Sequence, residues 1–239
     1  MGNFDNKVVM ITGAGGAIAS GIVEKFAREG ANLVLVDRNT DAMQKRMDEL
    51  GDTVTDYLIT GGDLGKPDDM DKIIVDAVEK FGQIDVLAHA VGGYAGGSPV
   101  HETDIEVFEK QIYLNTRIVF ITLGHVAKHM VDKGIAGSLV VILAKTGLGG
   151  AKNTAAYAAS KAAAQRIVES MALELKDHDI RVNGVMPSTA DTPANRESMP
   201  DADFSKWVTP AQIADAIAYL ASDSASAVTG QALGVYNKT

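Results

Sequence analysis

The stretch "TGAGGAIA", residues 12–19, decides the fold, because it joins an apolar run to a helical pattern through a turn crowded with glycines. The residues before it, 7–11 ("KVVMI"), form the short apolar run that is typical of a buried strand. The residues after it, 18–30, carry apolar side chains at helical spacing and end on Gly30, a common helix terminator. Glycines in such a turn let backbone amides approach an anion at the positive end of the helix. The stretch therefore predicts the first unit of an anion-binding α/β fold, although a plain tight turn is the alternative for any lone glycine cluster.

The rest of the chain alternates strand patterns with helix patterns. Apolar runs that predict strands recur at 32–36, 53–59, 84–90, 138–143, 180–186 and 231–236. Helical patterns fill the segments between them, at 41–51, 67–82, 103–132 (two helices), 155–176 and 210–222. Continuous apolar strands that alternate with helices are typical of a parallel sheet covered on both faces. We therefore expect an α/β fold with a doubly wound parallel seven-stranded sheet, in a single domain that spans 1–239.

The composition narrows the classes of partner. The chain has 239 residues and a formal net charge of −9, and it lacks the Lys/Arg cluster that nucleic acid or an anionic membrane needs. No apolar run reaches the length of a membrane-spanning helix, and no signal-peptide pattern opens the sequence. The absence of cysteine excludes thiol catalysis and Cys-based zinc sites. We expect a small-molecule partner, no metal site, and a cytoplasmic location, with which the missing cysteines agree.

The glycine turn and the end of the second strand together indicate a dinucleotide site. The candidate residues in the turn are Thr12, Gly13, Gly15, Gly16, Ala17 and Ile18. Asp37 follows the second strand, where a carboxylate can accept both ribose hydroxyls of an adenosine. The Asp37 carboxylate would repel a 2′-phosphate, so it favours NAD(H) as the cofactor. The adjacent Arg38 could pair with that phosphate, so NADP(H) remains an alternative cofactor. A helix N-cap is the alternative role for Asp37, one that Thr40 or Asp41 could also fill.

Two further turns lie at the carboxyl ends of strands, where open α/β sheets bind ligands. The segment 62–64 ("GDL") ends the third strand, and Asp63, followed by Leu64, could meet the adenine edge. The segment 88–93 ("AHAVGG") ends the fourth strand, and its glycines allow a close approach of backbone to a ligand. The cofactor-binding candidates in this second turn are Ala90, Val91 and Gly92.

Tyr157 and Lys161 are four residues apart in one predicted helix and therefore share a face. An ammonium at about 4 Å from a phenol is worth roughly 4 kcal/mol at an effective dielectric near 20. We expect it to lower the tyrosine pKa by about 2–3 units from its ordinary value near 10, which would make Tyr157 a usable proton donor. A solvated helix face is the alternative for any isolated Tyr-x-x-x-Lys pattern.

The chain resembles the short-chain dehydrogenases/reductases over essentially its whole length. The matching residues are 12–19, Asp37, 63–64 ("DL"), 89–92 ("HAVG"), Asn115, 157–161 ("YAASK") and 183–192 ("NGVMPSTADT"). The resemblance implies a three-layer Rossmann fold and an NAD(P)-dependent oxidoreductase. It also implies that Tyr157 donates a proton, that Lys161 binds the nicotinamide ribose and that Asn115 holds a proton-relay water. The loop that orients the nicotinamide carboxamide in the family matches the segment with Pro187, Thr189 and Thr192.

The sequence also departs from the family pattern. Ala17 and Ala19 stand where the family usually has glycine, "HAVG" replaces the usual Asn-Asn-Ala-Gly, and the family's catalytic serine falls on Ala144. In a ketone reductase that hydroxyl donates to the developing oxyanion, and its loss commonly costs about 10²–10³-fold in rate. A conjugated C=N acceptor delocalises the charge, so one proton from Tyr157 can meet it.

These departures point to one group within the family. The segments 90–97 ("AVGGYAGG"), 144–145 and 191–207 ("DTPANRESMPDADFSKW") together resemble quinoid dihydropteridine reductases, which also lack the serine. We therefore expect an NADH-preferring reductase of a quinonoid dihydropterin-like heterocycle. The alternatives are a general carbonyl reductase or alcohol dehydrogenase of the ketoacyl-reductase type, a non-catalytic NAD(H)-binding sensor, and a serine replaced in the laboratory.

The long segment 187–210 is expected to act as a lid over the substrate, since loops of this length in compact domains are usually functional or disordered. The side chains expected to line the substrate side are Tyr94, Lys145, Met199 and Trp207. For Tyr94 and Trp207, ordinary packing is the alternative.

An apolar stripe on the helix that carries Tyr157 bears on assembly. It consists of Ile167, Val168, Met171, Ala172 and Leu175. In the family such helices pair across a two-fold axis, so a homodimer or homotetramer is expected. The alternative is that the stripe packs only on its own sheet.

Overall fold

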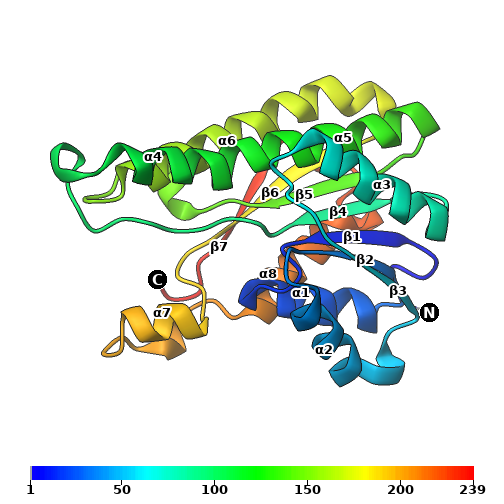
Figure 1. The fold of residues 1–239 in the computed structure, drawn as a ribbon, viewed down its shortest axis with the longest axis horizontal. Helices are drawn as coiled ribbons and strands as arrows, with labels where there is room; N and C mark the ends of the chain where they lie inside the picture. The colour runs from blue at the N-terminus through cyan, green and yellow to red at the C-terminus, as the bar shows by residue number, and fades with distance from the viewer. Residues whose placement is uncertain (1) are drawn as a thin grey trace.

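The seven strands form one parallel sheet. The computed structural model describes residues 2–239 and orders the strands β3-β2-β1-β4-β5-β6-β7, with parallel pairing throughout (Figure 1). The strands are β1 (Val8–Thr12), β2 (Asn32–Val36), β3 (Asp56–Thr60), β4 (Val86–His89), β5 (Ser138–Ile142), β6 (Arg181–Pro187) and β7 (Ala232–Val235). The inner strands β1 and β5 are buried over their whole length and β2 over all but its first residue, as coverage of both faces requires.

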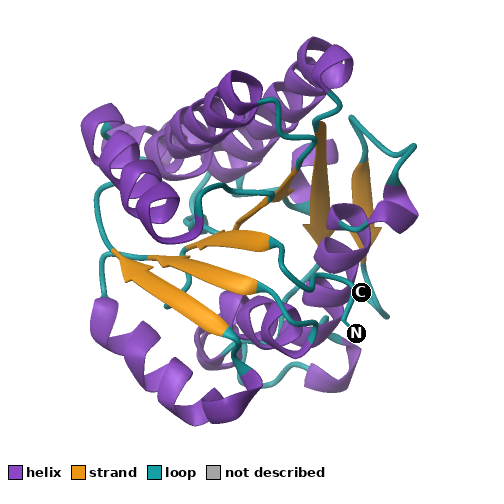
Figure 2. Ribbon diagram, turned by 90° about the vertical axis from the view of Figure 1, so that its right-hand side faces the viewer, coloured by secondary structure: helices purple, strands orange, loops and turns teal. Residues whose placement is uncertain are grey.

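Helices cover both faces of this sheet (Figures 1 and 2). They are α1 (Ala17–Arg28), α2 (Thr40–Leu50), α3 (Pro67–Phe81), α4 (Ile105–Ile112), α5 (Ile118–Lys133), α6 (Ala155–Leu175), α7 (Pro193–Ser198) and α8 (Pro210–Ala221). One core cluster joins the sheet to α1, α2 and α8, and a second joins it to α3, α5 and α6. The expected three-layer, doubly wound α/β fold is confirmed.

Two local features differ from the sequence prediction. The third strand begins at Asp56 rather than at 53, because Gly51–Thr53 forms a 3₁₀ turn directly after α2. The two helices predicted within 103–132 are joined by a π-helical turn, Tyr113–Arg117, which the sequence did not predict. Single π turns inside helices are frequent at functional sites, and this one holds Asn115.

The strand order places the candidate site. The connection reverses direction between β1 and β4, which are neighbours in the sheet although β2 and β3 intervene in the sequence. In doubly wound sheets a ligand binds outside the carboxyl ends of the strands at this switch point. The turns 13–16 and 90–93 follow β1 and β4 at that edge. No helix in the described part of the chain, residues 2–239, has the length and apolar character of a membrane span.

Candidate active site

The turn after β1 leaves the start of α1 open to an anion. Helix α1 begins without a side-chain cap and without an acidic residue in its first turn, whereas Asn39, Thr192 and Thr209 cap α2, α7 and α8. The first backbone N–H groups of a helix have no intrahelical partner. Gly13 has φ 71°, and a Cβ there would lie 3.1 Å from the carbonyl carbon of Ala90. Glycine therefore lets the two turns at the switch point meet closely.

A cavity of about 200 Å³ lies between these turns. The predicted cofactor residues that line it are Gly13, Gly16, Asp37, Arg38, Asp63, Leu64, Ala90, Val91 and Gly92. Residues not predicted from the sequence complete it: Val36, Gly62, Tyr113, Leu114 and Ile118. Gly15, Ala17 and Ile18 belong to the adjoining turn and the first turn of α1.

Asp37 is fixed by the backbone of the neighbouring segments. Its Oδ2 accepts from the Gly15 amide at 3.0 Å and its Oδ1 from the Asn39 amide at 3.1 Å. The N-cap of α2 is Asn39, whose Oδ1 accepts from the Ala42 amide. The N-cap alternative for Asp37 is therefore corrected, as is the suggestion that Thr40 or Asp41 fills that position.

Asp63 is tied to a residue that the sequence did not single out. The Tyr113 hydroxyl lies 3.0 Å from its Oδ1 and 3.2 Å from its Oδ2, and the Gly65 amide donates to Oδ1 at 3.0 Å. The Gly65 amide, then Tyr113, holds the pKa of Asp63 below its ordinary value. Tyr113 comes from the π turn, so the helical layer and the end of β3 meet over the cavity.

Thr12 departs from its expected role. Its side chain is fully buried, and its Oγ1 lies 2.8 Å from Nδ1 of His89, its register partner across β1 and β4. Burial lowers the pKa of His89 to about 3, so the imidazole is neutral. Thr12 therefore joins the two strand ends inside the sheet, and its hydroxyl does not face the cavity.

Asn115 clamps the turn after β4. It is fully buried, its Nδ2 donates to the Gly93 carbonyl at 2.9 Å, and its Oδ1 accepts from the Gly93 amide at 3.0 Å. The same Nδ2 reaches Gln111 Oε1 at 3.2 Å and Ser160 Oγ at 3.1 Å. The amide side chain thus connects the π turn, the β4 turn and α6.

Lys161 lies against the same turn. A Cβ on Gly92 would be 2.9 Å from Asn115 Oδ1 and 3.2 Å from Lys161 Nζ. Lys161 is buried, and its Nζ donates to the Ile142 carbonyl at the end of β5 at 2.9 Å. Burial lowers the pKa of Lys161 to about 8. The structure therefore brings Asn115, Gly92 and Lys161 together.

The expected lowering of the Tyr157 pKa is wrong for this arrangement. Burial, and secondly the neighbouring Tyr94, raise the pKa of Tyr157 to about 12. The two rings meet edge to face, with centroids 5.0 Å apart and an interplanar angle of 78°. The four-residue spacing places the lysine one turn away, but its ammonium points to the Ile142 carbonyl and burial dominates at the phenol.

Ala144 ends the buried part of the segment after β5, with its backbone extended and its carbonyl accepting from the Gly147 amide. The next residue, Lys145, is exposed. Its Nζ lies 4.9 Å from the centroid of the Tyr236 ring and donates to the Thr239 carbonyl at 3.4 Å. The C-terminal residues 236–239 therefore border the segment where the family's serine is expected.

The segment 187–210 is ordered by short elements. It contains α7, a 3₁₀ turn at Phe204–Lys206 and a bridge between Ala190 and Val208. Trp207 is only 5% exposed and packs on Phe204, with ring centroids 4.8 Å apart. The expectation that Trp207 lines the substrate side is therefore corrected, because this large ring anchors the segment in the core.

The remaining candidates predicted for the substrate side and the nicotinamide loop lie near the surface or near the end of β6. Met199 is 40% exposed and Tyr94 is 64% exposed. Pro187 pairs with Val235 in the sheet, and the Thr192 hydroxyl accepts from the Asn195 amide as the cap of α7. The Thr189 carbonyl accepts from the Val208 amide. Tyr94 is thus the aromatic side chain that lies both exposed and against Tyr157.

The apolar stripe on α6 packs inwards. Val168 and Ala172 are buried, and Ile167, Met171 and Leu175 pack against the same core cluster. The alternative, packing on the chain's own sheet, therefore accounts for this stripe. Exposed apolar side chains of the same helical layer lie elsewhere, at Ile105, Phe108, Phe120 and Leu173.

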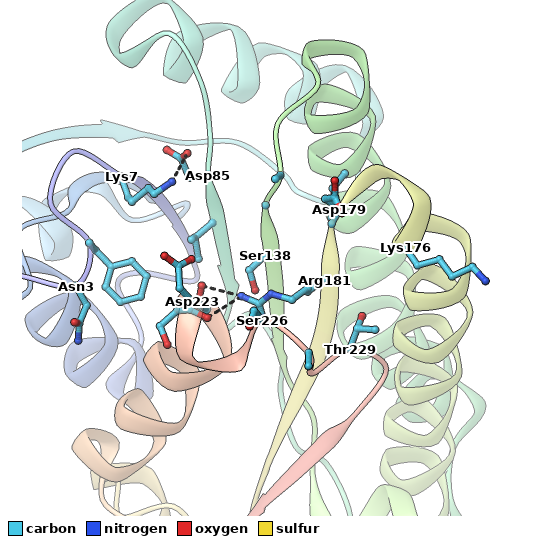
Figure 3. A pocket seen from close by; sticks show the side chains of 18 residues that line it. Asn3, Lys7, Asp85, Ser138, Lys176, Asp179, Arg181, Asp223, Ser226 and Thr229 are labelled. Carbon is cyan, nitrogen blue, oxygen red and sulfur yellow. Dashed lines mark hydrogen bonds and ion pairs between the residues drawn. The ribbon is translucent and has the colours of Figure 1, made fainter.

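A second cavity, of about 510 Å³, opens at the opposite edge of the sheet, among the amino ends of β4, β5 and β6 (Figure 3). Arg181 and Asp85, two of its charged groups, are used within the fold. Arg181 donates to the carbonyls of Leu220, Ala221 and Ser222 at the end of α8. Asp85 accepts from the Val8 amide and from Gln83. We therefore assign this cavity no part in the chemistry.

Arg181→Met should destabilise the protein, since it leaves three carbonyls at the end of α8 without their charged donor. We expect the free energy of unfolding to fall by about 2 kcal/mol, the scale of hydrogen bonds to a charged group. Urea denaturation measures this change. Lys176→Met, which removes an exposed charge from the same cavity lining, is the matched control and should change it by less than about 0.5 kcal/mol. Equal effects of the two changes would contradict the capping role.

Among residues 2–239, no group of three or more His, Asp or Glu side chains is arranged to hold a metal ion. A family model described as short chain dehydrogenase matches residues 7–203. Glucose 1-dehydrogenase of Gluconobacter oxydans is 30% identical over 97% of this chain and 91% of its own length. The 3-oxoacyl-acyl-carrier-protein reductase of Thermotoga maritima is 31% identical over 97% of this chain and 96% of its own length.

The known structure of levodione reductase is 26% identical and superimposes with a TM-score of 0.91, covering 98% of this chain and 97% of that one. The matched family model runs from β1 through the Tyr157–Lys161 helix, so it includes both halves of the candidate site. The protein belongs to the short-chain dehydrogenase/reductase family of oxidoreductases.

Proposed function

We propose that the protein is an NADH-preferring reductase in which Tyr157 donates the proton. Support for the cofactor comes from the uncapped start of α1, the close approach of the two glycine turns and the cavity between them. These features suit a pyrophosphate at the helix N-terminus and an adenosine over Asp37. A nicotinamide bound in this way supplies the hydride.

The preference for NADH rests on Asp37. Two backbone amides hold its carboxylate in place, and its remaining lone pairs are available to ribose hydroxyls. A fixed negative charge at this position disfavours a 2′-phosphate. Arg38 lines the same cavity and is the group that NADP(H) would use, so the proposal is a preference for NADH and not exclusion of NADP(H).

The substrate we propose is a planar quinonoid dihydropterin-like heterocycle. The observation that carries this choice is Ala144, which presents a methyl group where a ketone reductase of this family has its hydroxyl. An exposed aromatic ring, Tyr94, lies edge to face with Tyr157 and offers an apolar surface for a flat ring. The motifs around 90–97, 144–145 and 191–207 support the same substrate class.

The proton chemistry follows from burial. With a pKa near 12, Tyr157 carries its proton at neutral pH. A protonated phenol can donate in a reduction, whereas oxidation of an alcohol would need the phenolate; at this pKa the phenol is a weaker acid than one matched to the working pH. Lys161 and Asn115 hold the adjacent backbone at the Ile142 and Gly93 carbonyls.

The second candidate is a carbonyl reductase or alcohol dehydrogenase. The names of the glucose dehydrogenase, oxoacyl reductase and levodione reductase relatives favour it over the pterin substrate. Ala144 argues against it, because a ketone oxygen would lack the second donor. The two candidates share the cofactor and the proton donor and differ only in the acceptor.

Binding and turnover, measured in sequence, test this proposal. NADH and NADPH are titrated into the wild-type protein, and the NADH complex is then mixed with quinonoid dihydropterin while NADH absorbance is followed. Tighter binding of NADH and its oxidation by the pterin support the proposal. Binding without turnover on any acceptor would instead indicate a nucleotide sensor.

The pH profile of kcat/KM should fall on the alkaline side as Lys161 loses its proton. Its ammonium lies beside Gly92 in the turn that lines the proposed cofactor cavity, and its pKa of about 8 makes this positive charge at the site fall away as pH rises. We expect kcat/KM for reduction to be level near pH 6–7 and to fall about tenfold per unit above pH 8. Tyr157 stays protonated throughout this range.

Initial rates between pH 6 and pH 10 provide the measurement. Lys161→Arg keeps the positive charge over the whole range, so its profile should lose the alkaline fall even if its rate is lower. A wild-type rate that is level or rising up to pH 10 would contradict the assignment.

We also propose self-association as a homodimer or homotetramer through the outer face of α4 and α5. Ile105, Phe108 and Phe120 are exposed there, and contiguous exposed apolar side chains often mark protein interfaces. Sedimentation of the purified chain tests this, and a monomer at micromolar concentration would contradict it.

A further inference from the structure

Arg46 reaches from α2 to the glycine turn. Its Nη1 donates to the Ala14 carbonyl and its Nη2 to the Gly16 carbonyl, at 3.4 Å for the second bond. The side chain is half-buried, and among residues 2–239 no carboxylate forms an ion pair with it within 4.0 Å. The guanidinium therefore binds backbone carbonyls of the glycine turn instead of a neighbouring acid, which indicates that it stabilises the conformation of this turn.

The two carbonyls belong to two specific peptide groups. The Ala14 carbonyl shares a planar peptide with the Gly15 amide, which donates to Asp37 Oδ2 at 3.0 Å. That peptide is therefore held at both ends, by Arg46 at its oxygen and by Asp37 at its nitrogen. The Gly16 carbonyl shares the other peptide with the Ala17 amide, the first N–H of α1.

The second peptide decides where an anion can bind. In a trans peptide the carbonyl and the N–H point in opposite directions. The Gly16 oxygen accepts the first bond of α1 from the Ser20 amide at 3.2 Å and a second bond from Arg46, so the Ala17 N–H points out of the uncapped start of α1. The amides of Gly13, Ala14 and Gly16 already donate to backbone carbonyls, which leaves the start of α1 as the donor group of the turn.

Glycine makes this control necessary. Gly15 and Gly16 have no Cβ, so their backbone can adopt conformations that other residues exclude. Without Arg46 the Gly16 oxygen still accepts from the Ser20 amide, but the Ala14 oxygen would lose its side-chain donor. The peptide between Ala14 and Gly15 could then rotate and present its carbonyl to an incoming phosphate. A carbonyl in that position would repel the anion that the N–H attracts.

We propose that Arg46 is a positioning residue that presets the glycine turn for the pyrophosphate of the dinucleotide. Its guanidinium fixes the Ala14–Gly15 peptide and, together with the Ser20 amide, the Gly16–Ala17 peptide, so the turn binds without reorganising. The inference rests on the proposed cofactor, since it concerns the phosphates of that molecule.

The experiment compares ligands that do and do not carry phosphates. Dissociation constants for NADH are measured by fluorescence for the wild type, Arg46→Met, Arg46→Lys and Lys45→Met. ADP and adenosine are then measured as competitors of NADH for each protein. Lys45 is the matched control, because it is the neighbouring residue on α2, is exposed and carries the same charge.

We expect Arg46→Met to weaken NADH and ADP about tenfold, the scale of losing hydrogen bonds to a charged donor, and adenosine less than about twofold. Arg46→Lys should recover part of the loss, since one ammonium can reach one carbonyl but not bridge two. Lys45→Met should change each constant less than about twofold. At saturating NADH, kcat of Arg46→Met should fall less than about threefold, which separates turn positioning from damage to the catalytic cluster.

Two results overturn the inference alone: unchanged NADH affinity in Arg46→Met, or an equal loss for adenosine and ADP, which would mean general damage to α2. Failure of the wild type to bind NADH or ADP would overturn the proposed cofactor and this inference with it.

Discussion

Tyr157→Phe should abolish pterin reduction, lowering kcat by about 10²–10⁴-fold, the range supplied by a positioned proton donor. The phenylalanine ring keeps the edge-to-face contact with Tyr94 at 5.0 Å, so the fold and NADH affinity should be nearly unchanged. Stopped-flow oxidation of bound NADH measures the chemical step, and fluorescence titration measures the affinity.

Tyr94→Phe is the matched control for this variant. It removes a hydroxyl from the neighbouring ring while keeping the aromatic pair, and we expect less than about a fivefold change in kcat. If Tyr157→Phe retained more than a tenth of the wild-type rate, another group would be the proton donor and the proposed chemistry would fail.

Ala144→Ser should raise the reduction of simple ketones by about 10²-fold, since it adds the donor that stabilises a developing oxyanion. Pterin reduction should change by less than about threefold, because a delocalised charge gains little from a second hydroxyl. Steady-state kcat/KM for both acceptors measures the two effects.

Ala144→Gly controls for side-chain size at this buried position, because it alters the side chain without adding a donor. We expect it to leave the ketone rate at the wild-type level. A ketone rate that the serine variant does not improve would mean that the missing hydroxyl is not what restricts the acceptor.

The fold could be predicted because its signals are local and strong. Buried parallel strands read as continuous apolar runs, and 32–36 matches β2 residue for residue. Glycine ends the helix patterns at Gly30 and Gly82, where positive φ angles favour it. The π turn at Tyr113–Arg117 could not be predicted, because its residues read like any other helical turn.

The sequence predicts which site residues share a helix face, because residue spacing fixes that geometry. It does not predict their pKa values or packing roles, because these depend on burial. The four-residue step from Tyr157 to Lys161 places both on one helix face, but the direction of the tyrosine pKa depends on burial that the sequence does not display. The sequence around Trp207 does not show whether the ring packs in the core or lines the substrate side. Its packing on Phe204 in the structure distinguishes the two roles.

Residues that act through tertiary contacts are not marked by a motif in the sequence. Arg46 lies in an ordinary polar helix and becomes informative only where α2 meets the glycine turn. Tyr113 meets Asp63 across a long stretch of chain. Gln111 could have been found, because it stands four residues before Asn115 on a helical pattern, a spacing that brings two amides together.

The ratio of kcat/KM for quinonoid dihydropterin to kcat/KM for a simple ketone, both with NADH and the wild-type protein, tests the central claim most directly. If Ala144 marks a choice of acceptor, the ratio should exceed about 10² in favour of the pterin, matching the loss of one oxyanion donor on the ketone side. A ratio below one, with ketone turnover at rates ordinary for such enzymes, would contradict the claim and assign the protein to carbonyl or alcohol chemistry.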